Sequence, residues 1–326
     1  MINKKYILPA VSVATALFLS ACSIGNGEVI IKNNVYNHNV FTIGGVSMPI
    51  SDAKVYVAGF KKDYGTAYGV DLWELDFQTD ELASYVKSAA LQEMTQVICL
   101  NLMAEEAGLT LDEGENDKVK EAADAYFQSL TDTDKDYLNV SESDVASMYE
   151  SYALAKKMYT SLIVGVDNEV SEDEARVMVA KQIFVSDVDK ATEVVTRLEN
   201  GEDFATVAGA YNEKSEIDIN ISRGDLPDEV VEAAFDLDEG QYTSCIQTDD
   251  GYYYIYCVTK YDEELTAQNK EKIVAEREQE AFESVYEEYE SSKESELYSD
   301  NWDSIEVNVD GVDAGDFFLY YEEYFE

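Results

Sequence analysis

The sequence predicts an α+β protein in which a helical domain is interrupted by a compact domain that contains a small antiparallel sheet. Three observations predict this class. Apolar residues recur at helical spacing from residue 51 to about residue 165, and strands then alternate with helices from 177 to 258. A long glutamate-rich stretch without Gly or Pro follows. The apolar content of 46% and the aromatic content of 12% are typical of a folded chain.

Residues 1–21 are predicted to be a lipoprotein signal peptide. Lys4 and Lys5 precede an apolar run that is too short to span a bilayer comfortably. The run ends in Leu19-Ser20-Ala21-Cys22, which resembles the lipobox cut by the bacterial lipoprotein signal peptidase. Acyl chains on Cys22 would anchor the chain to a membrane, whereas the alternative is an ordinary secretory signal with an unrelated cysteine. Residues 22–50 are expected to be a tether, which includes His38, the single histidine.

Residues 51–175 are predicted to form a helical domain. Ser51 and Asp52 can cap its first helix. The longest apolar stripe runs from 82 to 102 and stops before Gly108, a residue that suits a left-handed helix end. Two more helices are expected from about 115 to 130 and from 141 onward. Because all are amphipathic, they must pack together or against a partner.

Residues 176–262 are predicted to fold in the order β-α-α-β-α-β-β. Pro227 opens the third helix, as proline does in a first helical turn. Asp250-Gly251 indicates the turn of the final hairpin. Residues 263–326 begin with a helix to about 297, which is expected to dock on the helical domain. A strand-like 302–307 follows, and then an acidic aromatic tail that is expected to be mobile or lightly docked.

The segment from about 175 to 261 resembles the parvulin family. Four stretches carry the resemblance: Ala180-Lys181-Gln182-Ile183-Phe184-Val185, Leu198-Glu199-Asn200-Gly201-Glu202-Asp203-Phe204, Ala233-Ala234-Phe235-Asp236-Leu237-Asp238-Glu239-Gly240 and Thr248-Asp249-Asp250-Gly251-Tyr252-Tyr253-Tyr254-Ile255. With the flanking helices and the lipobox, the chain is similar to PrsA/SurA-type extracytoplasmic foldases. This resemblance implies a parvulin-like four-stranded sheet, inserted in a chaperone domain that the C-terminal helix completes. It also implies a peptidyl-prolyl cis-trans isomerase that acts on unfolded or partly folded secreted polypeptides at the outer face of the cell membrane.

The resemblance also implies the positions of the site. Gln182 and Tyr253 stand where the family carries histidines, and Asp218 corresponds to an acidic or thiol group at the start of the second strand. Since both histidines are absent, the expected activity is weak. The proline-binding positions correspond to three apolar residues, namely Leu226, Val230 and Phe235.

Two other functions are alternatives. One is a non-catalytic holdase that binds clients in a cradle of the helical domain, and the 24 tyrosines suit such a surface. The other is a ligand-binding or adhesive surface lipoprotein, which the lack of repeats disfavours. The 68 acidic against 23 basic residues give a net charge of −45, which disfavours nucleic acid as a partner and favours basic clients.

No cofactor or metal is expected. No histidine follows His38, so histidine-based catalysis and histidine metal sites are disfavoured in the folded domains. The acidic run 132–136 resembles the start of a calcium loop, but Tyr137 and Ser143 occupy the positions that need Gly and Glu. Cys245 and Cys257 fall on opposite arms of the predicted hairpin, where either a disulfide or a register that separates them is possible.

Overall fold

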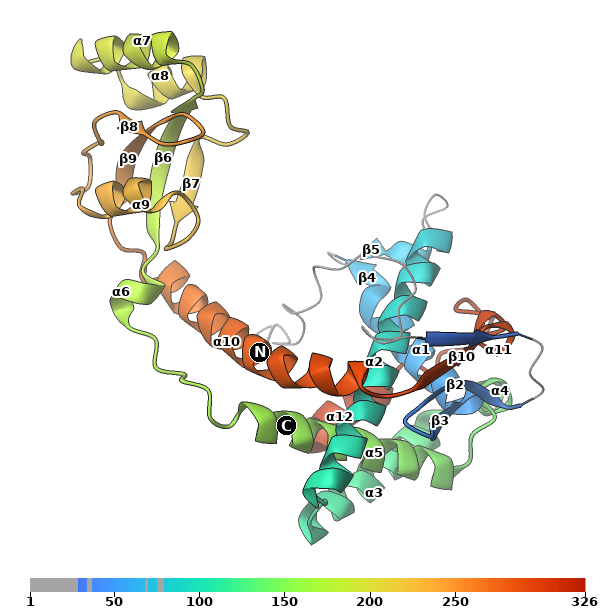
Figure 1. Ribbon diagram of the computed structural model, residues 1–326. Helices are drawn as coiled ribbons and strands as arrows, with labels where there is room; N and C mark the ends of the chain where they lie inside the picture. Colours follow the sequence, from blue (N-terminus) through green and yellow to red (C-terminus); the bar gives the residue numbers. More distant parts are fainter. Residues whose placement is uncertain (1–28, 34–36, 68–69, 75–78, 326) are drawn as a thin grey trace, which may run out of the picture. The chain divides into compact units, whose positions relative to one another are not determined.

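The computed structural model describes residues 29–33, 37–67, 70–74 and 79–325 (Figure 1). Contacts divide the chain into two compact units. The first unit comprises Met1–Gly165 and Ala281–Glu326, and the second comprises Val166–Glu280. The predicted α+β class is confirmed, with a sheet-containing unit inserted in the sequence of a largely helical one. Cys22 and the predicted signal peptide lie outside the described residues.

The first unit is built on long helices that pack through their apolar faces. Helix α2 contacts α1 and α5, and α3 contacts α5. Capping boxes begin α3, α4 and α5. In each, the side chain of the N-cap residue accepts a hydrogen bond from the backbone nitrogen three residues on, and the side chain of that residue accepts one from the backbone nitrogen of the N-cap. The helices are α1 (Ile50–Tyr64), α2 (Thr79–Ala107), α3 (Glu113–Ser129), α4 (Asp132–Leu138) and α5 (Glu142–Ile163).

A four-stranded sheet that the sequence pattern does not predict completes this unit. Its strands are β1 (Val29–Lys32), β2 (Asn39–Ile43), β3 (Val46–Pro49) and β10 (Ser295–Tyr298), in the order β1-β10-β2-β3. The pair β1–β10 is parallel and the other pairs are antiparallel. Residues 39–49, expected in the tether, therefore belong to the folded body, and Phe41 and Ile43 are fully buried. A short pair, β4 (Thr66–Ala67) and β5 (Val70–Asp71), and a 3-10 turn, η1 (Leu72–Glu74), lie between α1 and α2.

The C-terminal segment also differs from expectation. Helix α10 spans Glu263–Ser291 and contributes to both units, since the second unit ends at Glu280. The expected strand at 302–307 is absent, and Trp302 lies in the short helix α11 (Ser299–Asp303). The acidic tail ends in helix α12 (Phe317–Phe325), which contacts α3 and α1. Its aromatic residues, rather than its carboxylates, decide its position.

The elements of the second unit are α6 (Glu172–Ala175), β6 (Met178–Val185), α7 (Val188–Glu199), α8 (Phe204–Tyr211), β7 (Asp218–Ile221), α9 (Asp228–Phe235), β8 (Ile246–Gln247) and β9 (Tyr252–Thr259). From β6 to β9 the second unit has the predicted order β-α-α-β-α-β-β, and the short helix α6 precedes it. The strands form an antiparallel sheet in the order β7-β6-β9-β8.

Two separate apolar clusters cover the faces of this sheet. Helix α9 packs on one face, which we call the α9 face, and α7 and α8 pack on the other, the α7–α8 face. Cys257 belongs to the α9 face, whereas Cys245 lies beside Tyr254 on the opposite face. Both thiols are free, because the hairpin register places them on opposite sides of the sheet.

Candidate functional site

Two of the three predicted catalytic residues, Gln182 and Tyr253, share the α9 face. The register of β6 and β9 pairs Gln182 with Ile255 and Phe184 with Tyr253. Because side chains alternate between the faces of a strand, Gln182, Phe184 and Tyr253 all lie on one side of the sheet. The structure therefore brings Gln182 and Tyr253 to diagonal positions on neighbouring strands.

Gln182 is a buried amide that holds the chain segment before β7 in place. Only 6% of its surface is exposed, and its Nε2 donates a hydrogen bond to the backbone oxygen of Glu216 at 2.9 Å. That bond fixes the orientation of the amide, because a carbonyl oxygen can only accept. The Oε1 of Gln182 is buried without a hydrogen-bond partner. One of the two N–H donors of this side chain is thus engaged within the protein.

Tyr253 is 2% exposed, and its ring centroid lies 4.8 Å from that of Phe184. Its hydroxyl donates to Oδ2 of Asp250 at 3.2 Å. Burial, together with the nearby carboxylate of Asp250, raises the pKa of Tyr253 to about 12. The phenol therefore stays protonated at neutral pH, and its oxygen can still accept one hydrogen bond.

The structure does not bring Asp218 to this site. Asp218 pairs across the strands with Lys181, the neighbour of Gln182 on β6, and forms an ion pair with it. Since adjacent residues of a strand point to opposite faces, Asp218 lies away from Gln182, and its side chain is 76% exposed. The alternation of residues along β7 indicates this position of Asp218, because Ile219 and Ile221 are the residues that face the α9 cluster.

The predicted proline-binding residues are largely part of the core. Val230 is fully buried in the cluster beneath α9, and Leu226 is half-buried at its edge. The ring of Phe235 is also buried, and the guanidinium of Arg176 lies 4.3 Å from its centroid. Leu226 thus offers more accessible apolar surface on this face than Val230 or Phe235 does.

Lys214 belongs to the site although the sequence analysis did not single it out. Its Nζ lies 4.4 Å from the ring centroid of Phe184 and 6.0 Å from that of Tyr253. The residue lies in the irregular segment between α8 and β7, where no periodicity assigns a side chain to a face. The structure therefore adds a cation to a face that the sequence analysis described as apolar and hydrogen-bonding.

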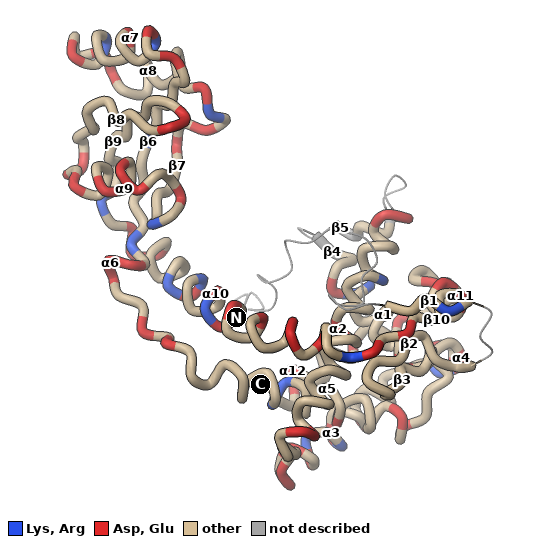
Figure 2. The backbone as a smooth tube through the Cα atoms, viewed as in Figure 1, with Lys and Arg blue, Asp and Glu red and all other residues tan. Residues whose placement is uncertain are grey.

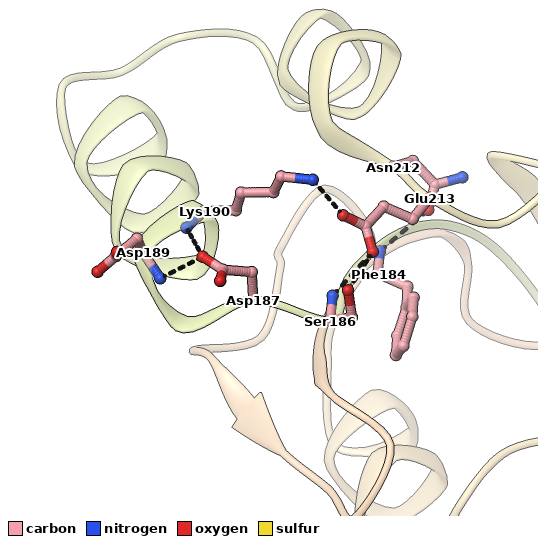
Figure 3. A network of polar contacts seen from close by, with 7 residues as sticks. All are labelled: Phe184, Ser186, Asp187, Asp189, Lys190, Asn212 and Glu213. Carbon is pink, nitrogen blue, oxygen red and sulfur yellow. Dashed lines mark hydrogen bonds and ion pairs between the residues drawn. The ribbon is translucent and has the colours of Figure 1, made fainter.

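Side-chain hydrogen bonds hold the segment around Lys214 against the end of β6 (Figure 3). Asn212 Oδ1 accepts from the backbone nitrogen of Phe184 at 3.0 Å. The carboxylate of Glu213 accepts from the nitrogen and hydroxyl of Ser186 at 2.9 and 2.7 Å, and it pairs with Lys190 at 2.6 Å. The hydrogen bonds from Lys190 and Ser186 stabilise the carboxylate and lower the pKa of Glu213 to about 2.

Comparison with known families assigns this region. Residues 140–267 match the family described as the PPIC-type PPIASE domain. The chain contains a PPIC-type PPIase domain. The match includes the whole four-stranded sheet of the second unit, so the α9 face with Gln182 and Tyr253 belongs to the PPIase domain.

Curated relatives are similar over a larger part of the chain. Foldase protein PrsA 3 of Bacillus cereus is 25% identical over 219 residues, which cover 65% of this chain and 75% of the relative. Foldase protein PrsA of Caldanaerobacter subterraneus subsp. tengcongensis is 26% identical over 260 residues, with 74% and 80% covered. A solved structure of a peptidylprolyl isomerase (PrsA) from Bacillus cereus is 21% identical, with a TM-score of 0.38, and covers 79% of this chain and 97% of its own.

The Glu213 network is expected to stabilise the PPIase domain in a pH-dependent way. The folded pKa of about 2 lies below the ordinary value of 4.5, so the stabilisation is complete above about pH 4.5 and is lost as the pH falls towards 2. Glu213→Gln should lower Tm by roughly 1–2 °C at neutral pH. This difference should shrink below about pH 4 in thermal melts monitored by circular dichroism. Glu216→Gln is the matched control, and a Tm difference that persists unchanged into acid would contradict the assignment.

Proposed function

We propose that this chain is an extracytoplasmic folding factor whose PPIase domain is a weak peptidyl-prolyl cis-trans isomerase. The match of residues 140–267 to the PPIC-type PPIase domain carries the proposal. The foldase names of the curated relatives support it, because they indicate unfolded or partly folded polypeptides as clients. The geometry of the α9 face supports a weak activity, because most of its polar groups are hydrogen-bonded within the protein.

Prolyl isomerisation places unusual demands on a site. The enzyme must lower a rotation barrier of roughly 18–20 kcal/mol about the peptide C–N bond, and no covalent bond breaks. What accelerates the rotation is an apolar surface for the prolyl ring and polar groups that fit the twisted amide better than the planar one. Neither a nucleophile nor a metal is required for this chemistry.

The polar groups of the α9 face are mostly engaged within the protein. Gln182 donates to the Glu216 carbonyl, and the Tyr253 hydroxyl donates to Asp250. The Tyr253 oxygen keeps one accepting position, and the rings of Phe184 and Tyr253 supply the apolar surface. Apart from the ammonium of Lys214, the site has few free donors and should stabilise the twisted amide only modestly, which is the physical reason for a degenerate activity.

A proline-peptide isomerisation assay tests this function directly. The wild-type protein is expected to accelerate cis-trans exchange above the spontaneous rate. Tyr253→Phe, which keeps the ring and removes the hydroxyl, should lower the catalysed rate roughly two- to tenfold. Asp218→Ala is the matched control and should leave the rate unchanged, because its carboxylate lies on the other face. A wild-type rate equal to the spontaneous rate would contradict the proposed activity.

We propose that the protein is held at the outer face of the cell membrane through a lipid on Cys22. The lipobox-like Leu19-Ser20-Ala21-Cys22 supports this anchor. Among the described residues, no helix has both the length and the apolar character to cross a bilayer. Cys22→Ala is expected to move the protein from the membrane fraction to the soluble fraction, as followed by immunoblotting. Unchanged membrane fractionation of this variant would contradict the anchor.

The charge of the chain supports basic segments of secreted proteins as clients. Figure 2 shows acidic residues spread over both units, with basic residues far sparser. Such a surface raises the encounter rate with cationic chains and lowers it with anionic ones, and salt weakens both effects. Client selection by this long-range field acts before any contact with the PPIase domain.

A second candidate function is a holdase on the first unit. Among the described residues, strand β1 lies at the edge of its sheet, and Ile31 is 64% exposed there. An edge strand presents unpaired backbone groups to which an extended client can add a further strand. The tyrosines support a holdase less than expected, because several of them, including Tyr56, Tyr126 and Tyr149, are buried in the core. Suppressed aggregation of an unfolded client without acceleration of isomerisation would select the holdase.

A further inference from the structure

Lys214 is the exception in the charge pairing of the second unit. Residues 166–280 are all described, and every other lysine and arginine among them has a polar partner. Each forms an ion pair with a carboxylate, apart from Arg176, which donates to backbone carbonyls. The Nζ of Lys214 instead lies over the rings of Phe184 and Tyr253. Among the described lysines and arginines of this unit, Lys214 alone forms neither an ion pair nor a hydrogen bond to a backbone carbonyl.

Side-chain hydrogen bonds hold the backbone segment that carries Lys214. Asn212 Nδ2 donates to the backbone oxygens of Lys214 and Glu216 at 3.0 and 2.9 Å. The carboxylate of Asp250, which contacts Tyr253, already accepts from Thr248 Oγ1 at 2.6 Å and from the Tyr253 hydroxyl. The exposed side chain of Lys214 thus places its ammonium over the Phe184 ring on the α9 face, while the carboxylate of Asp250 accepts hydrogen bonds from other donors.

We propose that Lys214 makes the PPIase domain prefer clients that carry an acidic residue directly before the isomerising proline. The inference rests on the proposed isomerase function and adds the substrate class of that site. A client carboxylate pairs with the ammonium and draws it away from the Phe184 ring. The uncovered ring then offers its apolar face to the prolyl ring, so recognition of the acid and binding of the proline occur together.

The size of the effect follows from the two contacts that are exchanged. An exposed cation–π contact and an exposed ion pair have similar strengths, so the exchange itself costs little. The expected preference is correspondingly modest, roughly two- to fivefold in catalysed rate. It acts at contact, whereas the net charge of −45 acts at long range. The preferred client is therefore a cationic chain with a local Asp or Glu beside proline.

A set of otherwise identical cationic peptides with Glu, Gln or Lys before proline tests the inference. Exchange measured by NMR avoids a coupling protease with its own sequence preference. The wild type should accelerate the Glu peptide roughly two- to fivefold more than the Gln peptide. Lys214→Gln should abolish this difference, and Lys214→Glu should shift the preference to the Lys peptide. Lys181→Gln, which removes an ion-paired lysine from the other face, is the matched control and should keep the wild-type preference.

The possible results separate this inference from the function on which it rests. Equal acceleration of the three peptides by the wild type overturns the preference and leaves the isomerase function intact. An equal loss for all peptides in Lys214→Gln also overturns it, because a general donor role would act on every client. If no peptide is accelerated, the isomerase function fails. In that case peptide titrations followed by NMR test the inference, and equal affinities for the Glu and Gln peptides would overturn it.

Discussion

Phe317→Ala is expected to lower the free energy of unfolding of the first unit by about 3–5 kcal/mol. Phe317 is fully buried, and its ring stacks on Tyr149 with centroids 4.3 Å apart. The rings of Tyr56 and Tyr126 lie 5.6 and 5.7 Å away. Truncation would leave a cavity among large, rigid aromatic side chains, which cannot collapse to fill it.

Urea unfolding followed by near-ultraviolet circular dichroism measures this effect. Leu319→Ala is the matched control, because Leu319 belongs to the same helix and is 56% exposed. Its transition midpoint should stay close to that of the wild type. If Phe317→Ala unfolded at the same urea concentration as Leu319→Ala, α12 would not belong to the core.

Gly251→Ala is expected to destabilise the PPIase domain by about 2–4 kcal/mol. Gly251 has φ of +153°, and an added Cβ would lie 2.6 Å from the backbone oxygen of Val185 and 2.7 Å from the Phe184 ring. The backbone contact cannot be relieved by rotating a side chain, so β6 and β9 must separate locally. Because the Phe184 ring would move as well, the isomerase rate should fall together with the stability.

Gly224→Ala separates the two causes of this effect. Gly224 has φ of +88°, but an added Cβ would meet nothing within 4 Å. This variant bears only the cost of the unfavourable backbone conformation, about 1–2 kcal/mol. Equal destabilisation by the two substitutions in urea unfolding would show that close packing at Gly251 is unimportant.

The second unit could be predicted because its pattern is local. Each strand and helix between residues 177 and 258 has its own periodicity, and the Asp250-Gly251 turn fixes the final hairpin. The sheet of the first unit could not be predicted, because β2 pairs with β10, about 250 residues further along the chain. Strands of four or five residues carry too little alternation to reveal such a partner.

For the site residues too, the sequence predicts what depends on local strand alternation but not what depends on the pairing of distant strands. The face of Gln182 and Tyr253 follows from strand alternation, which the sequence displays. The alternation of Asp218 with Ile219 and Ile221 indicates its face, but its partner Lys181 is known only from the folded register. Lys214 lies in an irregular segment that Asn212 and Glu213 hold by side-chain hydrogen bonds. Such bonds leave no periodic trace in a sequence.

The central claim is that a proline-containing segment binds and isomerises on the α9 face of the PPIase domain. Titration of the isotope-labelled protein with a proline peptide, followed by amide chemical shifts, tests it most directly. We expect the largest shifts at Phe184, Lys214 and Tyr253, with exchange of the peptide in the same samples. Shifts confined to the α7–α8 face, for example at Val194 and Tyr254, would contradict the claim.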